Sequence, residues 1–263
     1  MTPRPDAAFR QGGGPPEGWS EDRLLDGRVV LRQPVAGYRS AIDPVFLAAA
    51  VPARPGERVL DLGCGVGAAT LCLLARVPGL QAVGLELQAE LARAAGENAR
   101  LNGQGDHVLA IVGDVRRPPP RLAPGSFDHV LANPPYLEQG KATASPKELR
   151  RVADMEGEAR LADWLQAAIT FARDGGSVTF IQRADRLQGL LAGLEGACGD
   201  LVVFPLWAGP GKPARRVLVQ AVKQSRKPMT LASGLLLHAE GGGYTAEAEA
   251  VLREAAALRL RPA

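Results

Sequence analysis

Short apolar runs alternate with longer amphipathic segments through the middle of the chain. The short runs have the length and the apolar content of buried strands, and the segments between them have the apolar spacing of helices packed on a sheet. Strands are expected at 58–61, 81–86, 107–112, 127–131 and 177–182. Helices are expected between them at 68–76, 88–101 and 161–172. Strands separated by helices of this length predict βαβ units with right-handed crossovers and a mostly parallel sheet.

The end of the chain interrupts this alternation. Segments 201–207 and 216–222 are joined by a connection in which no helix fits, which predicts an antiparallel hairpin at the sheet edge. Residues 245–258 are expected to form an amphipathic helix with Thr245 as its N-cap. The expected fold class is therefore α/β, with a seven-stranded, mostly parallel sheet whose last strand is antiparallel.

The beginning of the chain has a different character. Residues 1–20 contain Gly12–Gly14 and two prolines with almost no apolar periodicity, so they are expected to form a flexible arm. Residues 21–263 are expected to form a single domain. Within it, 28–33 is expected to be a strand, and Asp43–Pro44 is typical of a capped helix start.

Composition excludes several classes of protein. No apolar stretch is long enough to span a bilayer, and the first residues lack the apolar core of a secretory signal. Three cysteines and three histidines without metal-ligand spacing argue against a disulfide framework or a metal site. A reduced, cytoplasmic protein without a metal is expected. The net charge of +3 does not by itself indicate a partner.

A glycine-rich loop joins the strand at 58–61 to the helix that follows. Asp61 stands before Gly63, Gly65 and Gly67, and these glycines allow a tight turn and let a ligand lie against bare backbone. Glu86 ends the next strand, where a carboxylate can accept both hydroxyls of a ribose. The loop alone also fits a nicotinamide dinucleotide site or a glycine turn that binds nothing.

A third acid, Asp114, ends the third strand, so three successive strands each end in a carboxylate. This pattern resembles that of the S-adenosylmethionine-dependent methyltransferases. The resemblance implies that Asp61 and the glycine loop face the methionine part, that Glu86 binds the ribose and that Asp114 meets the adenine. It also places Leu87 and Val115, which follow the second and third acids, in the cofactor site.

The tetrapeptide Asn133-Pro134-Pro135-Tyr136 follows the fourth strand. Two prolines fix the backbone and remove two N–H donors, and the Asn133 side chain offers a carbonyl beside them. Two acceptors that receive hydrogen bonds from both N–H groups of an exocyclic or amide nitrogen would point the lone pair of this nitrogen at a methyl donor. Tyr136 would stack on the planar group that carries the nitrogen. The tetrapeptide resembles that of amino-methyltransferases acting on adenine N6, cytosine N4, guanine N2 or glutamine N5.

Over residues 24–255 the chain resembles the bacterial tRNA1(Val) adenine-37 N6-methyltransferase family. The resemblance is carried by residues 37–43, 133–136, 211–217 and 236–245. It implies a Rossmann-like class I methyltransferase fold, S-adenosylmethionine as cofactor and RNA, most specifically tRNA, as partner. It also implies that Tyr38 and Arg39 lie near the methionine end of the cofactor, and it adds Asn133 to the residues that contact the cofactor.

Basic residues near these motifs are candidates for phosphate contacts, because a target base must leave its stack to reach a methyl donor. The candidates are Arg4, Arg10, Arg23, Lys141, Lys147, Arg150, Arg151, Lys212, Arg215, Arg216, Lys223, Arg226 and Lys227. Among them, Arg215 and Arg216 at a strand start are the ones for which a structural role is favoured.

Other functions stay open at this point. The same tetrapeptide serves methyltransferases of ribosomal RNA, on adenine N6 or guanine N2, and of a protein glutamine. Enzymes of the glutamine class usually carry a helical substrate domain ahead of the glycine loop, whereas only 60 residues precede Asp61 here. An RNA-binding protein that retains a cofactor site is the alternative without catalysis, and the intact tetrapeptide argues against it.

Overall fold

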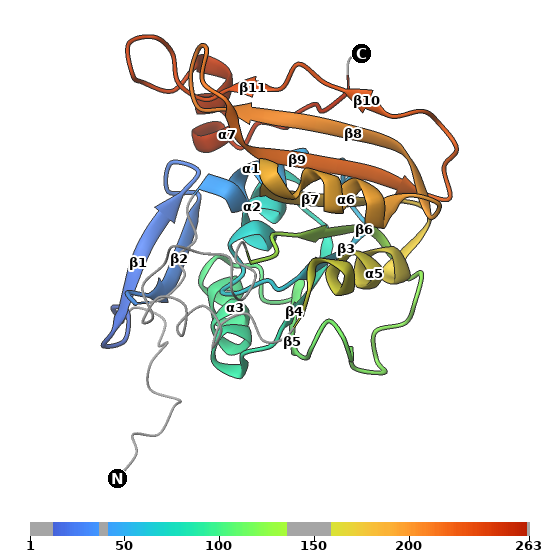
Figure 1. The fold of residues 1–263 in the computed structure, drawn as a ribbon. Helices are drawn as coiled ribbons and strands as arrows, with labels where there is room; N and C mark the ends of the chain where they lie inside the picture. Colours follow the sequence, from blue (N-terminus) through green and yellow to red (C-terminus); the bar gives the residue numbers. More distant parts are fainter. Residues whose placement is uncertain (1–12, 37–41, 136–158, 262–263) are drawn as a thin grey trace, which may run out of the picture.

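A nine-stranded sheet forms the centre of the computed structural model, which describes residues 13–36, 42–135 and 159–261 (Figure 1). Eight strands follow one another across the sheet in the order β10 (Thr230–Leu231), β8 (Cys198–Trp207), β9 (Ala214–Lys223), β7 (Ala172–Arg183), β6 (Phe127–Ala132), β3 (Arg58–Leu62), β4 (Gln81–Glu86) and β5 (Val108–Val112). The ninth strand, β11 (Leu235–Leu236), pairs with β8.

The centre of the sheet is parallel, as predicted. Strands β5, β4, β3, β6 and β7 are parallel neighbours, and β9 runs antiparallel between β7 and β8. The chain leaves β3 toward β4 and β5 and then returns to β6 on the other side of β3. The strand order therefore reverses between β3 and β6, which is where open α/β sheets bind ligands.

The predicted β8–β9 hairpin is antiparallel, but it does not lie at the bare edge of the sheet. The short strands β10 and β11 both pair with the outer side of β8. Each has two residues, too few to produce an alternation of apolar and polar positions, so the sequence pattern predicted seven strands where the structure has nine.

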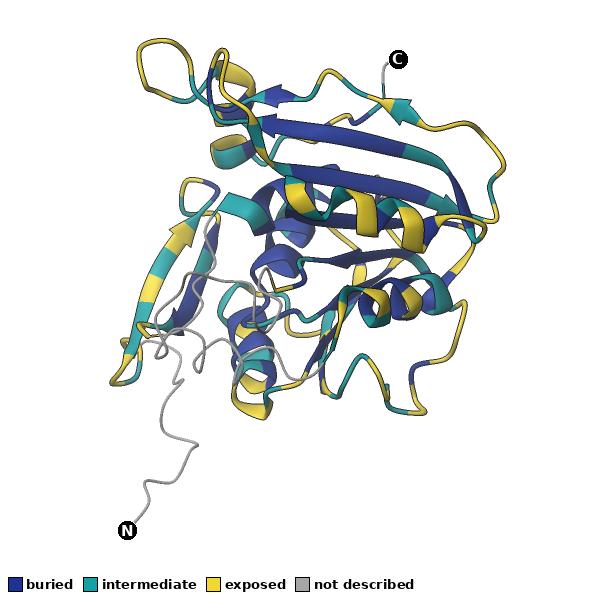
Figure 2. Cartoon of the chain, in the orientation of Figure 1, coloured by how far each residue is buried: buried dark blue, intermediate teal, exposed yellow. Residues whose placement is uncertain are grey.

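Helices cover both faces of the sheet, and most of its strands are buried between them (Figures 1 and 2). The helices are α1 (Ile42–Ala50), α2 (Ala68–Arg76), α3 (Ala89–Leu101), α5 (Leu161–Phe171), α6 (Leu187–Leu194) and α7 (Ala246–Glu254), with a 3₁₀ turn η2 (Ala184–Arg186) before α6. Successive residues of β3 belong to opposite cores: Val59 to the one that contains residues of α1, α2 and α7, and Leu60 to the one that contains residues of α5 and α6. This division explains why the central strands are apolar at almost every position.

The closing helix confirms its predicted cap but not its predicted end. The Thr245 hydroxyl accepts a hydrogen bond from the Ala248 amide at 3.2 Å, as an N-cap should. Helix α7 ends at Glu254, four residues before the expected end at 258, because Ala255 adopts a left-handed conformation. Within the described residues, no helix is long and apolar enough to cross a membrane.

A separate antiparallel hairpin precedes α1. It consists of β1 (Trp19–Leu24) and β2 (Val29–Pro34), so the boundary expected at residue 20 falls inside a strand. The sequence WSEDRL of β1 has apolar residues only at its ends, which gives no strand pattern. Residues 1–12 of the predicted arm lie outside the described residues.

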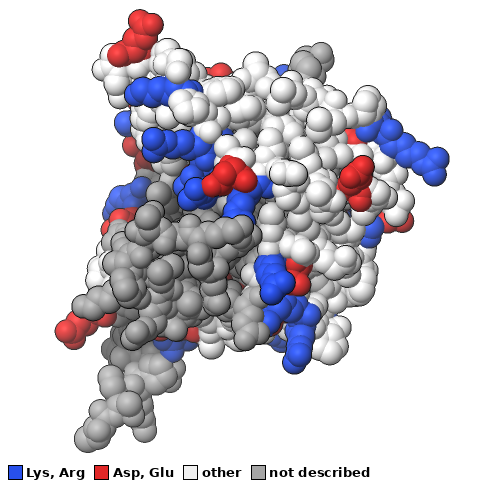
Figure 3. Space-filling model, in the orientation of Figure 1, with Lys and Arg blue, Asp and Glu red and all other residues white. Residues whose placement is uncertain are grey.

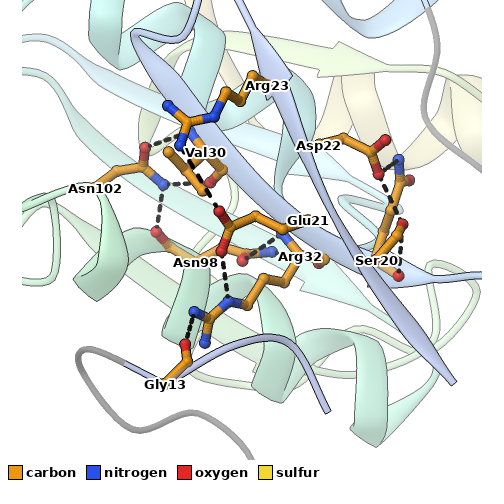
Figure 4. Close-up of polar contacts among 10 residues, drawn as sticks. Gly13, Ser20, Glu21, Asp22, Arg23, Val30, Arg32, Asn98 and Asn102 are labelled. Carbon is orange, nitrogen blue, oxygen red and sulfur yellow. Dashed lines mark hydrogen bonds and ion pairs between the residues drawn. The ribbon is translucent and has the colours of Figure 1, made fainter. Parts of the chain in front are cut away.

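Asn98 of α3 and Asn102, the residue that caps the end of this helix, hold β2 against the main domain (Figure 4). The Asn102 amide exchanges hydrogen bonds with the backbone of Val30, at 2.8 and 2.7 Å. One turn earlier, Asn98 does the same with the backbone of Arg32, at 3.0 and 2.9 Å, and also donates to the Val66 carbonyl in the glycine loop. Two residues four positions apart on a helix are separated by nearly the same distance as two residues two positions apart on a strand. The two asparagine side chains can therefore make the hydrogen bonds that a neighbouring strand would make with β2.

Candidate active site

Asp61, Glu86 and Asn133 lie together at the switch point of the sheet. Asp61 lies in β3, Glu86 ends β4, and Asn133 directly follows β6. Strand β3 pairs with both neighbours, with Asp61 opposite Gly84 on one side and Leu131 on the other. The carboxyl ends of three adjacent parallel strands therefore bring these residues to one edge of the sheet.

The glycine loop presents open backbone on one side and packs tightly on the other. A Cβ atom at Gly63 would lie 2.5 Å from Cη2 of Trp164, a buried side chain of α5 that covers this side of the loop. A Cβ atom at Gly65 would meet nothing within 4 Å. Both glycines have positive φ. The loop thus needs glycine for its packing at 63 and leaves room for a ligand beside 65.

Asp61 is a buried carboxyl group at the start of this loop. Its Oδ2 accepts a hydrogen bond from the Thr70 hydroxyl of α2, at 2.7 Å. Burial raises the pKa of Asp61 to about 7, against the pull of the Thr70 hydrogen bonds. A cation bound here would stabilise the ionised carboxylate that the protein alone disfavours.

Glu86 uses both carboxylate oxygens to fix the site. Oε2 accepts from the Gly65 amide and Oε1 from the Gln88 amide, each at 2.9 Å. Burial raises the pKa of Glu86. Each oxygen keeps a second lone pair, so the group can still accept hydroxyls from a ligand while it orients the loop.

Asp114 lies at the outer end of the site and is already paired. Its carboxylate accepts hydrogen bonds from the Arg116 guanidinium, at 2.8 Å, and from the Arg116 amide, at 2.9 Å. The Arg116 side-chain hydrogen bond is the main reason why the pKa of Asp114 lies below its usual range. Next to it, Leu87 and Val112 are large apolar side chains that the protein leaves exposed, 43% and 48%. They offer an apolar surface to a flat ligand. Val115 is half-buried and packs against the core that contains Leu60.

The proline carbonyl of the tetrapeptide is held by a buried glutamine. Nε2 of Gln182, near the end of β7, donates to the Pro134 carbonyl at 3.3 Å. Oε1 of Gln182 accepts from the Arg183 amide at 2.9 Å, which fixes which way the side-chain amide points. Pro134 is buried and Pro135 is exposed. One lone pair of the Pro134 oxygen therefore remains for another donor.

The residues Thr70, Trp164 and Gln182 take part in this site without having been predicted from the sequence. Each lies on a helix or strand with an ordinary packing pattern, and nothing in its local sequence marks it. The predicted residues Tyr38, Arg39 and Tyr136 lie outside the described residues, as do Arg4, Arg10, Lys141, Lys147, Arg150 and Arg151.

Three of the basic candidates have structural partners, and for Arg23 this is Glu21, at 4.0 Å. Nε of Arg216 lies 2.9 Å from Oδ2 of Asp43 at the start of α1, and Nζ of Lys223 donates to the Ala172 carbonyl at 2.9 Å. In the part of the chain that the structure describes, no group of His, Cys, Asp and Glu residues could hold a metal ion.

Comparison with known proteins shows similarity in sequence and in fold. Residues 41–154 match the family model described as methyltransferase small domain. The tRNA1(Val) (adenine(37)-N6)-methyltransferase of Actinobacillus succinogenes is 28% identical over 213 residues, covering 81% of this chain and 87% of the relative. The release factor glutamine methyltransferase of Rhodospirillum rubrum is 36% identical over 136 residues, covering 49% of this chain and 41% of the relative.

Among solved structures, a predicted O-methyltransferase from Agrobacterium tumefaciens is 25% identical to this chain. The similarity covers 84% of this chain and all of that protein, with a TM-score of 0.70. A similarity of this extent shows that the two chains share a fold.

Proposed function

Because this chain is an S-adenosylmethionine-dependent methyltransferase carrying a methyltransferase small domain, we propose that it methylates the exocyclic N6 of an adenine in tRNA in the cytoplasm. The observation that carries the proposal is the position of Asn133 and Pro134 at the end of β6, next to the glycine loop of β3. The names of the relatives that cover most of this chain support tRNA as the substrate.

The residues around the loop fit the cofactor. Asp61 offers a buried carboxylate to a cationic methionine part, and the backbone beside Gly65 is open to it. Glu86 would accept the ribose hydroxyls, and Asp114 would face the adenine beside Leu87. The cofactor, when bound, supplies an electrophilic methyl group on sulfur.

Asn133 and Pro134 would orient the amine. The amine of adenine is a poor nucleophile because its lone pair is delocalised into the ring. The Asn133 side-chain carbonyl and the Pro134 carbonyl, with its remaining lone pair, can accept hydrogen bonds from the two N–H groups of the amine. This turns the lone pair of the amine nitrogen toward the methyl group. Holding two reactants in line in this way can lower a barrier by roughly 7–11 kcal/mol in the best cases. The nitrogen carries a positive charge once methylated and then loses a proton, so the site needs no strong base.

A protein glutamine is the second candidate substrate. Its side-chain amide presents the same two N–H bonds, and the release factor glutamine methyltransferase of Rhodospirillum rubrum is 36% identical to part of this chain. However, that match covers only 41% of the relative, whereas the tRNA methyltransferase of Actinobacillus succinogenes is covered over 87% of its length. The similarity to the tRNA methyltransferase therefore extends over more of the chain, which favours tRNA as the substrate.

The role of Asn133 can be tested with Asn133→Ala. We expect kcat on tRNA to fall by about 100-fold or more, because misplacing the amine removes most of the alignment. The affinity for S-adenosylmethionine, measured by calorimetry, should hardly change. An equal loss of turnover and cofactor affinity would mean that Asn133 holds the cofactor or the fold and does not orient the amine.

A further inference from the structure

Basic side chains gather where β7 ends and β9 begins. Arg183 is the last residue of β7 and lies directly opposite Arg216 in the antiparallel pair β7–β9. Arg215 and Lys212, beside them, are exposed. Figure 3 shows Lys and Arg side chains concentrated at the upper left of this face, over the start of β9 in Figure 1. Two like charges directly opposite each other on a sheet repel, so this arrangement is unfavourable unless anions balance it.

The protein gives the two opposed arginines an acidic partner each, but among the described residues it gives none to the two basic residues beside them. Arg183 pairs with Asp185 at 2.6 Å, and Arg216 pairs with Asp43 at 2.9 Å. Arg215 and Lys212 make no ion pair with any side chain in the described part of the chain. The Arg183–Asp185 pair is exposed on both sides, 43% and 56%, and exposed pairs of this kind contribute little to stability. An external anion can therefore share Arg183 or replace Asp185 as its partner.

This basic surface begins one residue from a side chain that touches the tetrapeptide. Gln182, which donates to the Pro134 carbonyl, also accepts a hydrogen bond from the Arg183 amide. The backbone of Arg183 is thereby fixed in position relative to Pro134, whose carbonyl would orient the amine. A polyanion lying along Arg183 and Arg215 would pass beside the site.

We propose that Arg183 and Arg215, with Lys212 beside them, bind phosphates of the RNA backbone next to the target nucleotide. This proposal rests on the proposed function. A nucleotide that leaves its stack to enter an active site needs its flanking backbone held, and the planar guanidinium group binds phosphate through paired hydrogen bonds. Arg183 is the centre of this surface because its backbone is tied to the catalytic loop through Gln182.

The test compares the two ends of the same strand. Arg173, near the start of β7, is as exposed as Arg183 and has its own ion pair, with Asp128 at 2.7 Å, but it lies at the opposite edge of the sheet. We would measure the binding of total bacterial tRNA at several salt concentrations for the wild type, for Arg183→Gln with Arg215→Gln, and for the control Arg173→Gln. Calorimetry with S-adenosylmethionine would check that the cofactor site is intact in each variant.

We expect the double variant to bind tRNA about tenfold more weakly at about 0.1 M salt. The slope of log K against log salt should be smaller by about 0.9 for each phosphate that the variant no longer neutralises. Arg173→Gln should behave like the wild type. A further variant, Asp185→Asn, removes the competing carboxylate and should strengthen tRNA binding, which tests Arg183 without removing it.

Three outcomes would contradict the proposal. If Arg173→Gln weakens binding as much as the double variant, or if Asp185→Asn does not strengthen it, this surface is not the phosphate site although the substrate is tRNA. If the wild type itself does not bind tRNA, the proposed function fails and the phosphate site fails with it.

Discussion

At the scale of single residues, the buried carboxyl group of Asp61 has the clearest consequence. Its pKa is raised from 3.8 to about 7, so the folded protein keeps a proton that the unfolded chain has lost over this range. The contribution of Asp61 to stability therefore decreases as the pH rises from 3.8 to about 7 and stays constant above it. The residue costs stability at neutral pH, as is common where a site is built to bind a charged ligand.

Cofactor binding should show the opposite dependence on pH. A cationic ligand favours the ionised carboxylate, so the affinity for S-adenosylmethionine should rise by about tenfold per pH unit up to about pH 7 and then level off. Calorimetry between about pH 6 and pH 8 would measure this. Asp61→Asn should bind the cofactor weakly and without this dependence, which separates Asp61 from Glu86, whose pKa is also raised. A flat profile in the wild type would contradict the role given to Asp61.

Gln182 is expected to act through the Pro134 carbonyl, which makes it a positioning residue. Gln182→Leu should lower kcat by roughly tenfold with little change in KM for tRNA or in cofactor affinity, because the carbonyl loses the donor that orients it. Gln220→Leu is the matched control, since Gln220 is also buried and also donates to a backbone carbonyl, that of Ala50 at 2.9 Å. If both variants lose stability and activity equally, Gln182 only supports the fold.

The sequence predicted some residues of the site and missed others for a physical reason. Asp61, Glu86 and Asn133 each stand at the end of an apolar run, so strand prediction alone brings them to one edge. Thr70, Trp164 and Gln182 reach the site through packing between elements that are distant in the chain. Such contacts depend on the assembled layers and have no local pattern.

At the scale of elements, the link between β2 and α3 extends to the glycine loop. Asn98 is fully buried and satisfies the backbone of Arg32 as well as the Val66 carbonyl, whereas Asn102 contacts Val30 and its own helix and does not reach the loop. Figure 4 shows both asparagines facing the strand. The hairpin and the glycine loop are therefore joined by one side chain.

Replacing each asparagine by alanine should separate these two roles. Both variants should be less stable by about 1–3 kcal/mol for each backbone group left unpaired, as measured by denaturant unfolding. Asn98→Ala should in addition weaken the binding of S-adenosylmethionine, because the Val66 carbonyl between Gly65 and Gly67 loses its donor. Equal cofactor affinity in the two variants would show that the hairpin does not influence the loop.

Strand and helix prediction succeeded where the elements were long and apolar. Strands β3, β4, β5 and β6 and helices α2 and α3 fall within about a residue of their predicted positions, whereas β7 begins at Ala172, well before the predicted start at 177. Strands β1, β10 and β11 are either polar or very short. Helix α6 was missed because it contains Gly189 and Gly193, and both glycines allow close packing against leucine side chains of α5.

At the scale of the whole molecule, overall charge conceals the charge distribution. A net charge of +3 is compatible with almost any partner, yet basic residues concentrate where β7 ends and β9 begins. That concentration arises only when β9 is placed against β7, which brings Arg216 opposite Arg183. The fold class could be predicted from the chain, as could the meeting of Asp61, Glu86 and Asn133 at one edge of the sheet. The surface around them could not, because it depends on the order of the strands in the sheet.

The central claim is that this methyltransferase acts on adenine N6 in tRNA. The most direct measurement is a transfer assay with labelled S-adenosylmethionine and total tRNA from a strain that lacks the protein, followed by mass spectrometry of the nucleosides. We predict N6-methyladenosine in one tRNA, absent when Asn133→Ala replaces the wild type. No label in tRNA from a protein that binds the cofactor, together with label in a protein glutamine or in ribosomal RNA, would contradict the account.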